Sequence, residues 1–261
     1  MRINEYNPGH CVIIMLVVLL ASCSTLPQTG PETAPPMRQY GDLVEGKKEY
    51  AIDVFDPLEG FNRGVYRFNY YFDKYLFLPV VKGYAFITPD FLEDRITNFF
   101  KNLREITNLT NSILQFKGKS MAKTTGRIVI NTTIGIGGLF DPATAYFGIH
   151  RQDEDFGQTL GFYGVGHGPY LVLPVFGPSN LRDTTGLVVD SVVYSVMINE
   201  LVDQADMQTG EEDKLKWGLT VLSAIDTRHR TPFRYYGTGS PFEYDLVRML
   251  YTKQREFLIA E

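Results

Sequence analysis

The chain has 261 residues, of which 44% are hydrophobic and 21% charged, and its formal net charge is −5. This balance lacks the basic excess of a nucleic-acid-binding surface, so we expect no nucleic acid among its partners. The aromatic residues are 16 tyrosines and 18 phenylalanines against a single tryptophan, a composition that suits either a membrane boundary or a tyrosine-rich soluble core.

The first 22 residues are predicted to form a removable signal peptide. Residues 11–20 are an unbroken apolar run, and Ala21, Ser22 and Cys23 follow it. A short apolar core that ends in small residues is typical of a secretory signal sequence. The run is about half of the roughly 20 apolar residues that a membrane-spanning helix needs, which argues against a spanning anchor. Leu20 and the two small residues before Cys23 resemble the bacterial lipobox, which implies cleavage after Ser22 and a lipid anchor on the Cys23 thiol.

Residues 23–50 are expected to form a lipidated flexible tether, since four prolines and polar residues dominate them. Ser24 follows the lipidated cysteine where aspartate would favour the inner membrane, and bacterial sorting rules then imply export to the outer membrane. Cys11 leaves with the signal peptide and Cys23 is acylated. No free thiol is then left, which excludes disulfides, thiolate catalysis and cysteine metal sites.

Apolar periodicity predicts a single, mostly α-helical domain over residues 51–261. A first helix starts near Asp56, and Pro79 and Gly83 are expected to interrupt it. A second starts at Thr88-Pro89-Asp90 and carries the clearest amphipathic pattern, with Arg95, Lys101, Arg104 and Asn108 opposite its apolar face. Further helices are predicted over 120–134, 181–201, 211–224 and 242–258. The apolar stripes are Phe61, Val65, Phe68, Phe72 and Leu76 in the first helix, Leu92, Ile96, Phe99, Leu103, Ile106, Thr110 and Ile113 in the second, and Phe242, Leu246, Met249 and Leu250 in the last.

Two apolar segments differ from the rest, one within the helix predicted over 181–201 and one between the predicted helices. The run Leu187–Ile198 is interrupted by Asp190, so no segment of the mature chain is expected to cross a membrane. Residues 134–186 contain 11 glycines and 4 prolines, which predicts little regular helix, and they show no alternating strand pattern. Residues 162–178 are apolar all the same, which indicates a segment that is buried or lines a cavity.

Five strings in this chain together resemble the MlaA (VacJ) family of outer-membrane phospholipid-transport lipoproteins. The resemblance extends over roughly 53–225 behind the lipobox, and nothing beyond about Asp226 contributes to it. The strings are DPLEGFNR at 56–63, FGQTLG at 156–161, YGVG at 163–166, GPYLVLP at 168–174, and GPS followed by LRD at 177–183.

The resemblance implies a ring of amphipathic helices around a channel, embedded in the inner leaflet of the outer membrane. Phospholipids misplaced in the outer leaflet would descend through this passive channel and pass to an MlaC-like periplasmic carrier linked to an inner-membrane transporter, which maintains lipid asymmetry. Trimeric porins are implied partners, and neither a catalytic activity nor a cofactor is expected. The candidate channel residues are Phe61, Asn62, Arg63, Phe156, Gly157, Leu160, Gly161, Tyr163, Gly164, Gly166, Gly168, Pro169, Tyr170, Pro174, Gly177 and Pro178.

Several polar residues allow two interpretations. Asn62 and Arg63 either lie near the lipid path or provide a helix cap and a surface charge. The acidic residues 153–155 favour a solvated turn, because the spacing and glycine of a calcium loop are absent. Asp190 either is paired or faces water. Arg182 is about two helical turns away, which is too far for pairing without bending, and a water-facing Asp190 would line the aqueous part of a channel. A solvated helix face is favoured over a lipid-phosphate site for the basic cluster of Lys117, Lys119, Lys123 and Arg127.

No catalytic or metal site is predicted. His150, His167 and His229 have no second ligand at metal spacing, and Ser179 lies outside the nucleophile elbow of a hydrolase. The glycines at 135–138 lack the lysine of a phosphate loop. Two alternatives to lipid transport stay open: a lipoprotein phospholipase that acts on the same lipids, and a porin-associated structural lipoprotein.

Overall fold

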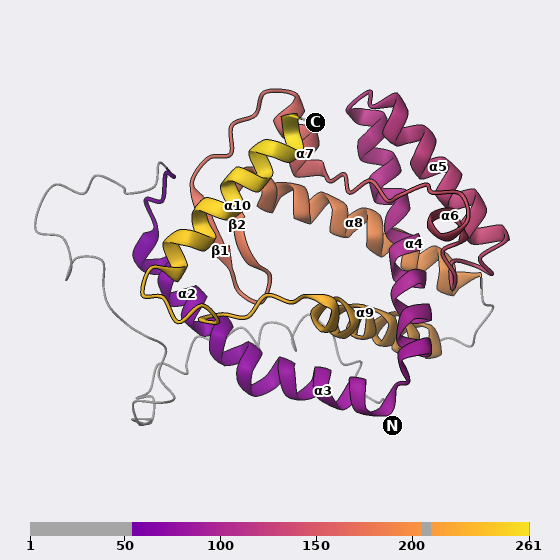
Figure 1. Ribbon diagram of the computed structural model, residues 1–261, viewed down its shortest axis with the longest axis horizontal. Helices are drawn as coiled ribbons and strands as arrows, with labels where there is room; N and C mark the ends of the chain where they lie inside the picture. Colours follow the sequence, from indigo (N-terminus) through magenta and orange to yellow (C-terminus); the bar gives the residue numbers. More distant parts are fainter. Residues whose placement is uncertain (1–53, 205–209, 261) are drawn as a thin grey trace, which may run out of the picture. The chain divides into compact units, whose positions relative to one another are not determined.

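The computed structural model describes residues 54–204 and 210–260, which belong to one compact unit spanning Arg38–Glu261. The predicted signal peptide, the anchor Cys23 and the tether lie outside the described residues. The described part is mostly helical, as predicted (Figure 1). Its elements are α2 (Glu59–Phe72), η2 (Asp73–Phe77), α3 (Leu78–Ile87), α4 (Asp90–Leu114), α5 (Gly118–Thr133), α6 (Pro142–Ala145), α7 (Phe156–Phe162), β1 (Tyr170–Leu173), β2 (Gly177–Asn180), α8 (Leu181–Asp203), α9 (Glu211–Arg230) and α10 (Glu243–Ala260).

The first helix continues through Pro79 and Gly83, so the predicted interruption was wrong. The π-helical turn η2 links α2 to α3, and Pro79 lies in the first turn of α3. A π turn changes the spacing of the backbone hydrogen bonds. Because this change falls just before the proline, the missing N–H of Pro79 does not end the helix. Gly83 is exposed, with open space where a side chain would be.

The predicted break after α5 is confirmed. The helix ends at Thr133, and Ile136, Gly137 and Gly138 then adopt positive φ angles of 54°, 65° and 89°. A side chain at Gly138 would also approach Asn102 of α4 to 2.5 Å. The turn therefore requires glycine both for its backbone conformation and for close contact with α4.

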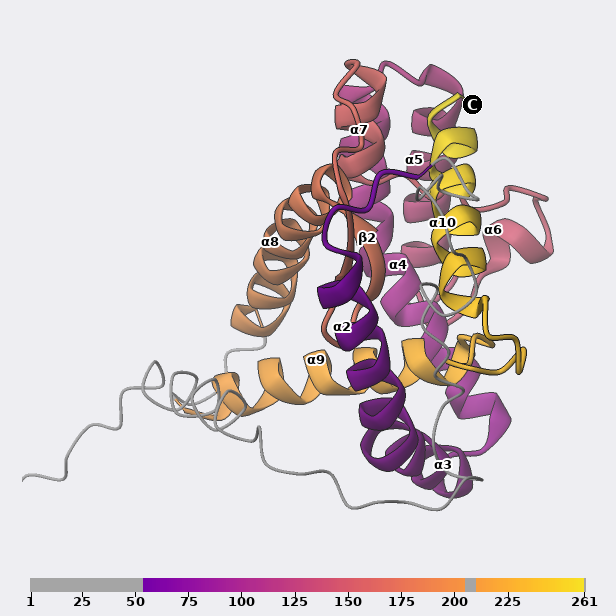
Figure 2. The ribbon, with the colours of Figure 1, turned by 90° about the vertical axis from the view of Figure 1, so that its left-hand side faces the viewer.

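Regular structure does occur within residues 134–186, which the sequence did not reveal. Strands β1 and β2 form an antiparallel hairpin with Tyr170 opposite Asn180 and Leu173 opposite Gly177. Each strand has only four residues, too few for an alternating pattern to stand out. The hairpin contacts both α8 and α10 and lies between them (Figure 2).

Helix α7 forms although it contains two glycines, and it packs closely on α8. A side chain at Gly186 of α8 would come within 2.3 Å of the backbone nitrogen of Gly157 in α7. The absence of side chains at both positions lets the two backbones approach each other. The glycines of this segment thus serve helix packing as well as turns.

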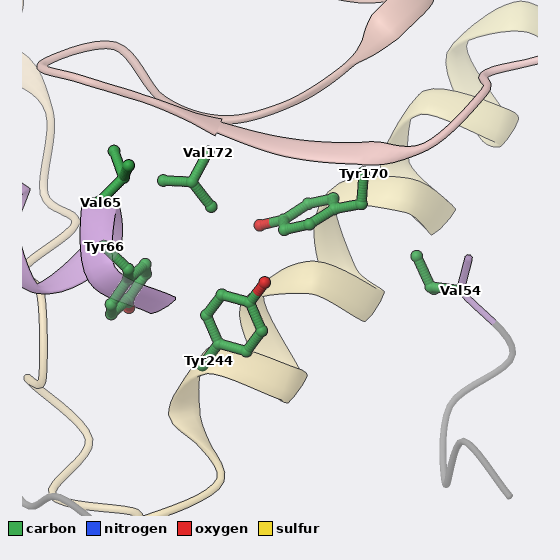
Figure 3. Packing of buried hydrophobic residues seen from close by; sticks show 6 residues of the cluster. All are labelled: Val54, Val65, Tyr66, Tyr170, Val172 and Tyr244. Carbon is green, nitrogen blue, oxygen red and sulfur yellow. The ribbon is translucent and has the colours of Figure 1, made fainter. Parts of the chain in front are cut away.

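A small apolar core joins α2, β1 and α10. It consists of Val54, Val65, Tyr66, Tyr170, Val172 and Tyr244 (Figure 3). The ring of Tyr66 contacts that of Tyr244 edge to face, with centroids 5.8 Å apart. The sequence alone assigned no role to the last helix, and the structure shows that it completes this core.

Outside that core, the buried residues of the described part are mainly polar or charged. In α4 the buried side chains include Glu93, Thr97, Glu105 and Asn108, whereas Leu92 and Ile113 are 47% and 50% exposed. Asn108 belongs to the polar face opposite the apolar stripe, and this face is partly turned into the protein, although Lys101 on it is exposed. A soluble protein buries the apolar stripe of a helix, and an exposed stripe is typical of a helix that meets lipid or a partner.

Helix α8 corrects a further prediction, that no segment of the mature chain is long enough to cross a membrane. Leu181–Asp203 has 23 residues and contains an 18-residue window with a mean hydropathy of 1.4, which meets the requirement by length and composition. Only 17% of its apolar window is buried within the protein. Asp190 lies inside this helix and does not end it.

Candidate functional site

A cavity of about 220 Å³ lies where the hairpin, α7, α8 and α10 meet. One part of its wall is apolar and the other part carries acids and a single guanidinium. This combination of an apolar wall with a few charged groups is typical of a ligand site. The lining residues are Leu173, Phe176, Pro178 and Leu187 on the apolar side, and Asp155, Ser179, Asp183, Asp190, Tyr251 and Arg255 on the polar side.

Arg255 of α10 connects two of the cavity carboxylates. It donates to both oxygens of Asp155 at 2.6 and 2.7 Å and to Asp183 at 3.1 Å. Burial opposes ionisation of Asp155, but the hydrogen bonds and charge of Arg255 outweigh it and lower the pKa of that carboxyl. Both interactions are charge-assisted hydrogen bonds, so much of the hydrogen-bonding capacity of the guanidinium is used within the protein.

Asp183 is the most heavily bonded acid of the cavity. Besides Arg255, it accepts hydrogen bonds from Arg182 at 2.9 Å and from the Tyr251 hydroxyl at 2.8 Å. Burial by itself raises its pKa, and these donors together lower it below the usual value. Asp183 therefore stays ionised and ties α8 to α10.

Asp190 differs from the other two acids because its hydrogen-bond partners are neutral. It accepts from the side-chain amide of Asn111 at 3.0 Å and from the backbone N–H of Phe156 at 2.9 Å. Among the described residues, no cationic group forms an ion pair with it. Burial is the main reason why its pKa is raised. The prediction that Arg182 is too far away agrees with the structure, in which Arg182 pairs with Asp183.

The start of α2 is held by the protein itself. Asn62 is fully buried, donates to Asp56 at 2.8 Å and to the Tyr170 carbonyl at 2.9 Å, and accepts from the Val172 N–H at 2.9 Å. It is not the cap of this helix, because the N-cap residue of α2 is Leu58 and Asn62 lies within the helix. Asn62 joins α2 to β1, and Phe61 beside it is 63% exposed.

Arg63 likewise pairs within the protein and is not a free surface charge. Its guanidinium lies 2.8 Å from Glu59 and 3.0 Å from Asp245 of α10. It also stacks over the Tyr244 ring at 4.2 Å from the centroid. Asn62 and Arg63 together therefore tie α2 to the hairpin and to α10.

The residues predicted from the glycine-rich strings fall into two groups. Phe156, Gly157, Leu160 and Gly161 lie in α7, where Gly161 packs against Ile259 of α10. The second group lies in the following loop and the hairpin. Tyr163, Gly164, Gly166 and Pro174 are exposed, Gly168 and Pro169 are half-buried, Tyr170 and Gly177 are buried, and Pro178 lines the cavity.

The expectation that the whole of 162–178 is buried or lines a cavity was only partly right. Residues 162–166 are exposed, and the Tyr163 hydroxyl donates to the Leu114 carbonyl at 2.7 Å. Phe176 at the hairpin turn is 71% exposed and also lines the cavity. Apolar composition identified this segment as unusual but did not distinguish its inner from its outer residues.

Two polar clusters were predicted to be solvated, and each prediction is only partly right. Glu154 is buried and pairs with Lys117 at 3.1 Å, whereas Asp153 beside it is exposed. Arg127 is 2% exposed and pairs with Glu105 at 2.8 Å. The first pair joins the loop before α7 to the residue that precedes α5, and the second joins α5 to the polar side of α4. The structure leaves Lys119 exposed, as predicted.

The histidines and Ser179 were assigned no catalytic role, and the structure shows their contacts. His229 contacts Glu93 at 2.9 Å, and His167 contacts its neighbouring Gly168 carbonyl at 2.6 Å. Ser179 is buried, and its hydroxyl lies 2.9 Å from that of Thr184. Within 54–204 and 210–260, no three metal-ligating side chains are grouped.

Sequence reasoning missed Tyr251 and Arg255 of the cavity. They continue a row on α10 that starts with Tyr244 and Arg248, at steps of three and four residues. Apolar periodicity directed attention to the opposite side of the helix, where Phe242 and Leu250 are 48% and 55% exposed. The polar-aromatic row was the signal that could have identified them.

Comparisons with known proteins extend over the same region. A protein of Rickettsia prowazekii (strain Madrid E) that is described as uncharacterized is 38% identical over 206 residues, 78% of each chain. The "Intermembrane phospholipid transport system lipoprotein MlaA" of Escherichia coli (strain K12) is 39% identical over 138 residues, 52% of this chain and 55% of that protein. The protein of the same name from Shigella flexneri is 39% identical over 145 residues, 54% of this chain and 57% of that protein.

A solved structure described as "Structural basis for maintenance of bacterial outer membrane lipid asymmetry" matches with a TM-score of 0.60 and 32% sequence identity. The match covers 78% of this chain and 98% of that chain. The model of the family described as MlaA lipoprotein matches residues 54–258, well beyond the limit near Asp226 that the sequence strings suggested. The chain belongs to the MlaA lipoprotein family.

Proposed function

We propose that this protein is an outer-membrane lipoprotein that removes misplaced phospholipids from the outer leaflet and so maintains lipid asymmetry. The observation that carries the proposal is the inverted distribution of side chains, with polar residues buried between helices and large apolar residues exposed on them. Family membership and relatives named for intermembrane phospholipid transport support it.

The exposed apolar residues give the body of the protein its own means of membrane attachment. Phe86 and Ile87 at the end of α3 are 90% and 76% exposed, and Phe91 at the start of α4 is 65% exposed. On α8, Val188 and Val192 are 60% and 58% exposed. Each apolar side chain that moves from water into lipid contributes roughly 1.5–3 kcal/mol. We propose that these surfaces lie in the periplasmic-facing leaflet and that the lipid on Cys23 first delivers the chain there.

Phospholipids would move through a passive channel that the helices surround as a ring, and the 220 Å³ cavity would be part of this path. Its apolar wall suits acyl chains and its charged wall suits a headgroup. The lipid gradient, or removal by an MlaC-like periplasmic carrier linked to an inner-membrane transporter, would drive the movement. A trimeric porin would be the neighbour of the protein in the membrane.

The test is deletion of the encoding gene followed by complementation. We expect phospholipid to accumulate in the outer leaflet of the deletion strain, measured by surface labelling of lipid amines and by sensitivity to detergent. The intact gene should restore both, whereas Cys23→Ala should restore them only in part. Unchanged surface phospholipid in the deletion strain would refute the proposal.

A phospholipase would change the same surface lipids, so it is tested separately. Purified full-length protein is incubated with phospholipid labelled in its acyl chain. Release of free fatty acid would indicate lipid hydrolysis, and intact lipid is the expected result. Ser179 in the cavity wall is buried, and its hydroxyl lies 2.9 Å from that of Thr184.

A further inference from the structure

The cavity lining has more negatively than positively charged groups, and this excess indicates which lipid headgroup the cavity binds. Three carboxylates and one guanidinium line it, on Asp155, Asp183, Asp190 and Arg255. Arg255 is bonded to two of the acids. Three hydrogen bonds to these two acids balance its charge, and the cavity offers little to an anionic group that would need a free cation.

Asp190 is the group that can receive a ligand charge. It accepts two hydrogen bonds, from an amide and from a backbone N–H, whereas an ionised carboxylate has about four acceptor positions. No described cation is paired with it. Arg255 acts on this carboxylate through its charge without pairing with it. A partly buried carboxylate without an ion-paired cation is unfavourable, so a cationic ligand group would gain both hydrogen bonds and charge compensation.

The remaining wall fits the rest of a phospholipid headgroup region. The volume of about 220 Å³ corresponds to roughly seven water molecules at ~30 Å³ each, enough for a small amino-alcohol group. The rings of Tyr251 and Phe176 line the same space, and aromatic faces attract cations. Leu173 and Leu187 provide the apolar boundary where the headgroup would meet the acyl chains.

We propose that the cavity binds the ammonium group of a zwitterionic phospholipid headgroup at Asp190, in preference to an anionic phosphoglycerol headgroup. This inference rests on the proposed function, because it assumes that phospholipid reaches the cavity. It adds selection among lipids to that function. Selection of this kind results from attraction of the amine together with repulsion of a headgroup that carries only negative charge.

The experiment places a photo-crosslinking residue at Leu187, which lines the cavity, or at Val188, which is 60% exposed on α8. Each full-length protein is reconstituted in nanodiscs that contain equal amounts of phosphatidylethanolamine and phosphatidylglycerol with identical acyl chains. Mass spectrometry counts the lipid adducts. Because the acyl chains are the same, a difference between the two lipids reports the headgroup alone.

At Leu187 we expect ethanolamine adducts to exceed glycerol adducts about fivefold, the ratio that corresponds to roughly 1 kcal/mol. At Val188, which samples surrounding lipid, the ratio should be close to one. Asp190→Asn should bring the Leu187 ratio towards one, Asp190→Glu should preserve it, and Asp213→Asn on the exposed start of α9 should leave it unchanged.

Each other outcome has a distinct meaning. A ratio near one at Leu187 in the unaltered cavity overturns the headgroup inference and leaves lipid transport standing, and this comparison needs no Asp190 variant to fold. A high ratio that persists in Asp190→Asn also overturns it, because another group would then select the lipid. Adducts at Val188 with none at Leu187 would refute the proposed lipid path itself.

Discussion

Asn62→Ala tests whether the start of α2 holds the fold together or serves the lipid path. Asn62 is fully buried, and its amide bonds two backbone groups of β1, the Tyr170 carbonyl and the Val172 N–H. Truncation leaves both groups buried without this partner, at about 1–3 kcal/mol for each unsatisfied group. Asp56 loses one donor as well but keeps the Tyr244 hydroxyl and Arg248. We therefore expect a loss of roughly 3–5 kcal/mol, a large share of the ~5–15 kcal/mol of a typical domain.

The assay is denaturant unfolding of the purified protein in one fixed detergent, followed by far-UV circular dichroism. The matched control is Asn98→Ala, because the Asn98 amide makes only a long, exposed bond of 3.4 Å to Leu139. That variant should lose no more than about 0.5 kcal/mol. A loss below about 1 kcal/mol for Asn62→Ala would refute the structural role. If transport were then impaired at full stability, Asn62 would act on lipid directly.

Three further predictions concern the cavity and the packing around it. Arg255→Leu should destabilise the protein by about 2–4 kcal/mol in the same assay, because it leaves Asp155 without its cation and Asp183 with Arg182 alone; an unchanged midpoint would contradict this. Asp190→Asn should stabilise the protein at pH 7. Since the folded-state pKa of this acid is raised, its favourable contribution exists below the unfolded pKa of about 3.9 and is lost as pH rises through the folded value. The gain measured at pH 7 should therefore vanish near pH 4, and an equal gain at both pH values would show that charge is not its cause. Gly186→Ala should cost about 1–3 kcal/mol because the added carbon would lie 2.3 Å from the Gly157 nitrogen, whereas Gly218→Ala, in open space on α9, should add up to about 1 kcal/mol; similar effects of the two changes would argue against close α7–α8 packing.

Apolar periodicity located the helices well but did not show which of their faces point into the protein. The apolar stripe of α4 was recognised from Leu92 to Ile113, and the helix spans Asp90–Leu114. Periodicity reports that one face is apolar, and only the surroundings decide whether that face meets protein or lipid. In α4 the acids and amides are inside, where they bond one another and Arg127 of α5. In α10, likewise, the apolar stripe did not reveal Tyr251 and Arg255, which lie on the other side of the helix.

The hairpin and the cavity were beyond sequence reasoning for a related reason. Strands of four residues are recognisable only through their partners, and β1 is held by β2 and by Asn62, which lies 108 positions before Tyr170. The Asp155–Arg255 pair likewise joins residues 100 positions apart. Local pattern carries no information on such distant pairs.

The sequence by itself determined the mostly helical class, the break after α5 and the family resemblance, because each depends on residues that are close together in the chain. Family membership then proved to extend through α10 to residue 258. Only the tertiary structure decided that α2 continues into α3, that polar side chains fill the interior, and that Asp190 lines a cavity where no cation of the described part of the chain pairs with it. These features depend on which residues, distant in the sequence, come into contact. Those contacts set the burial and the charge environment of each side chain.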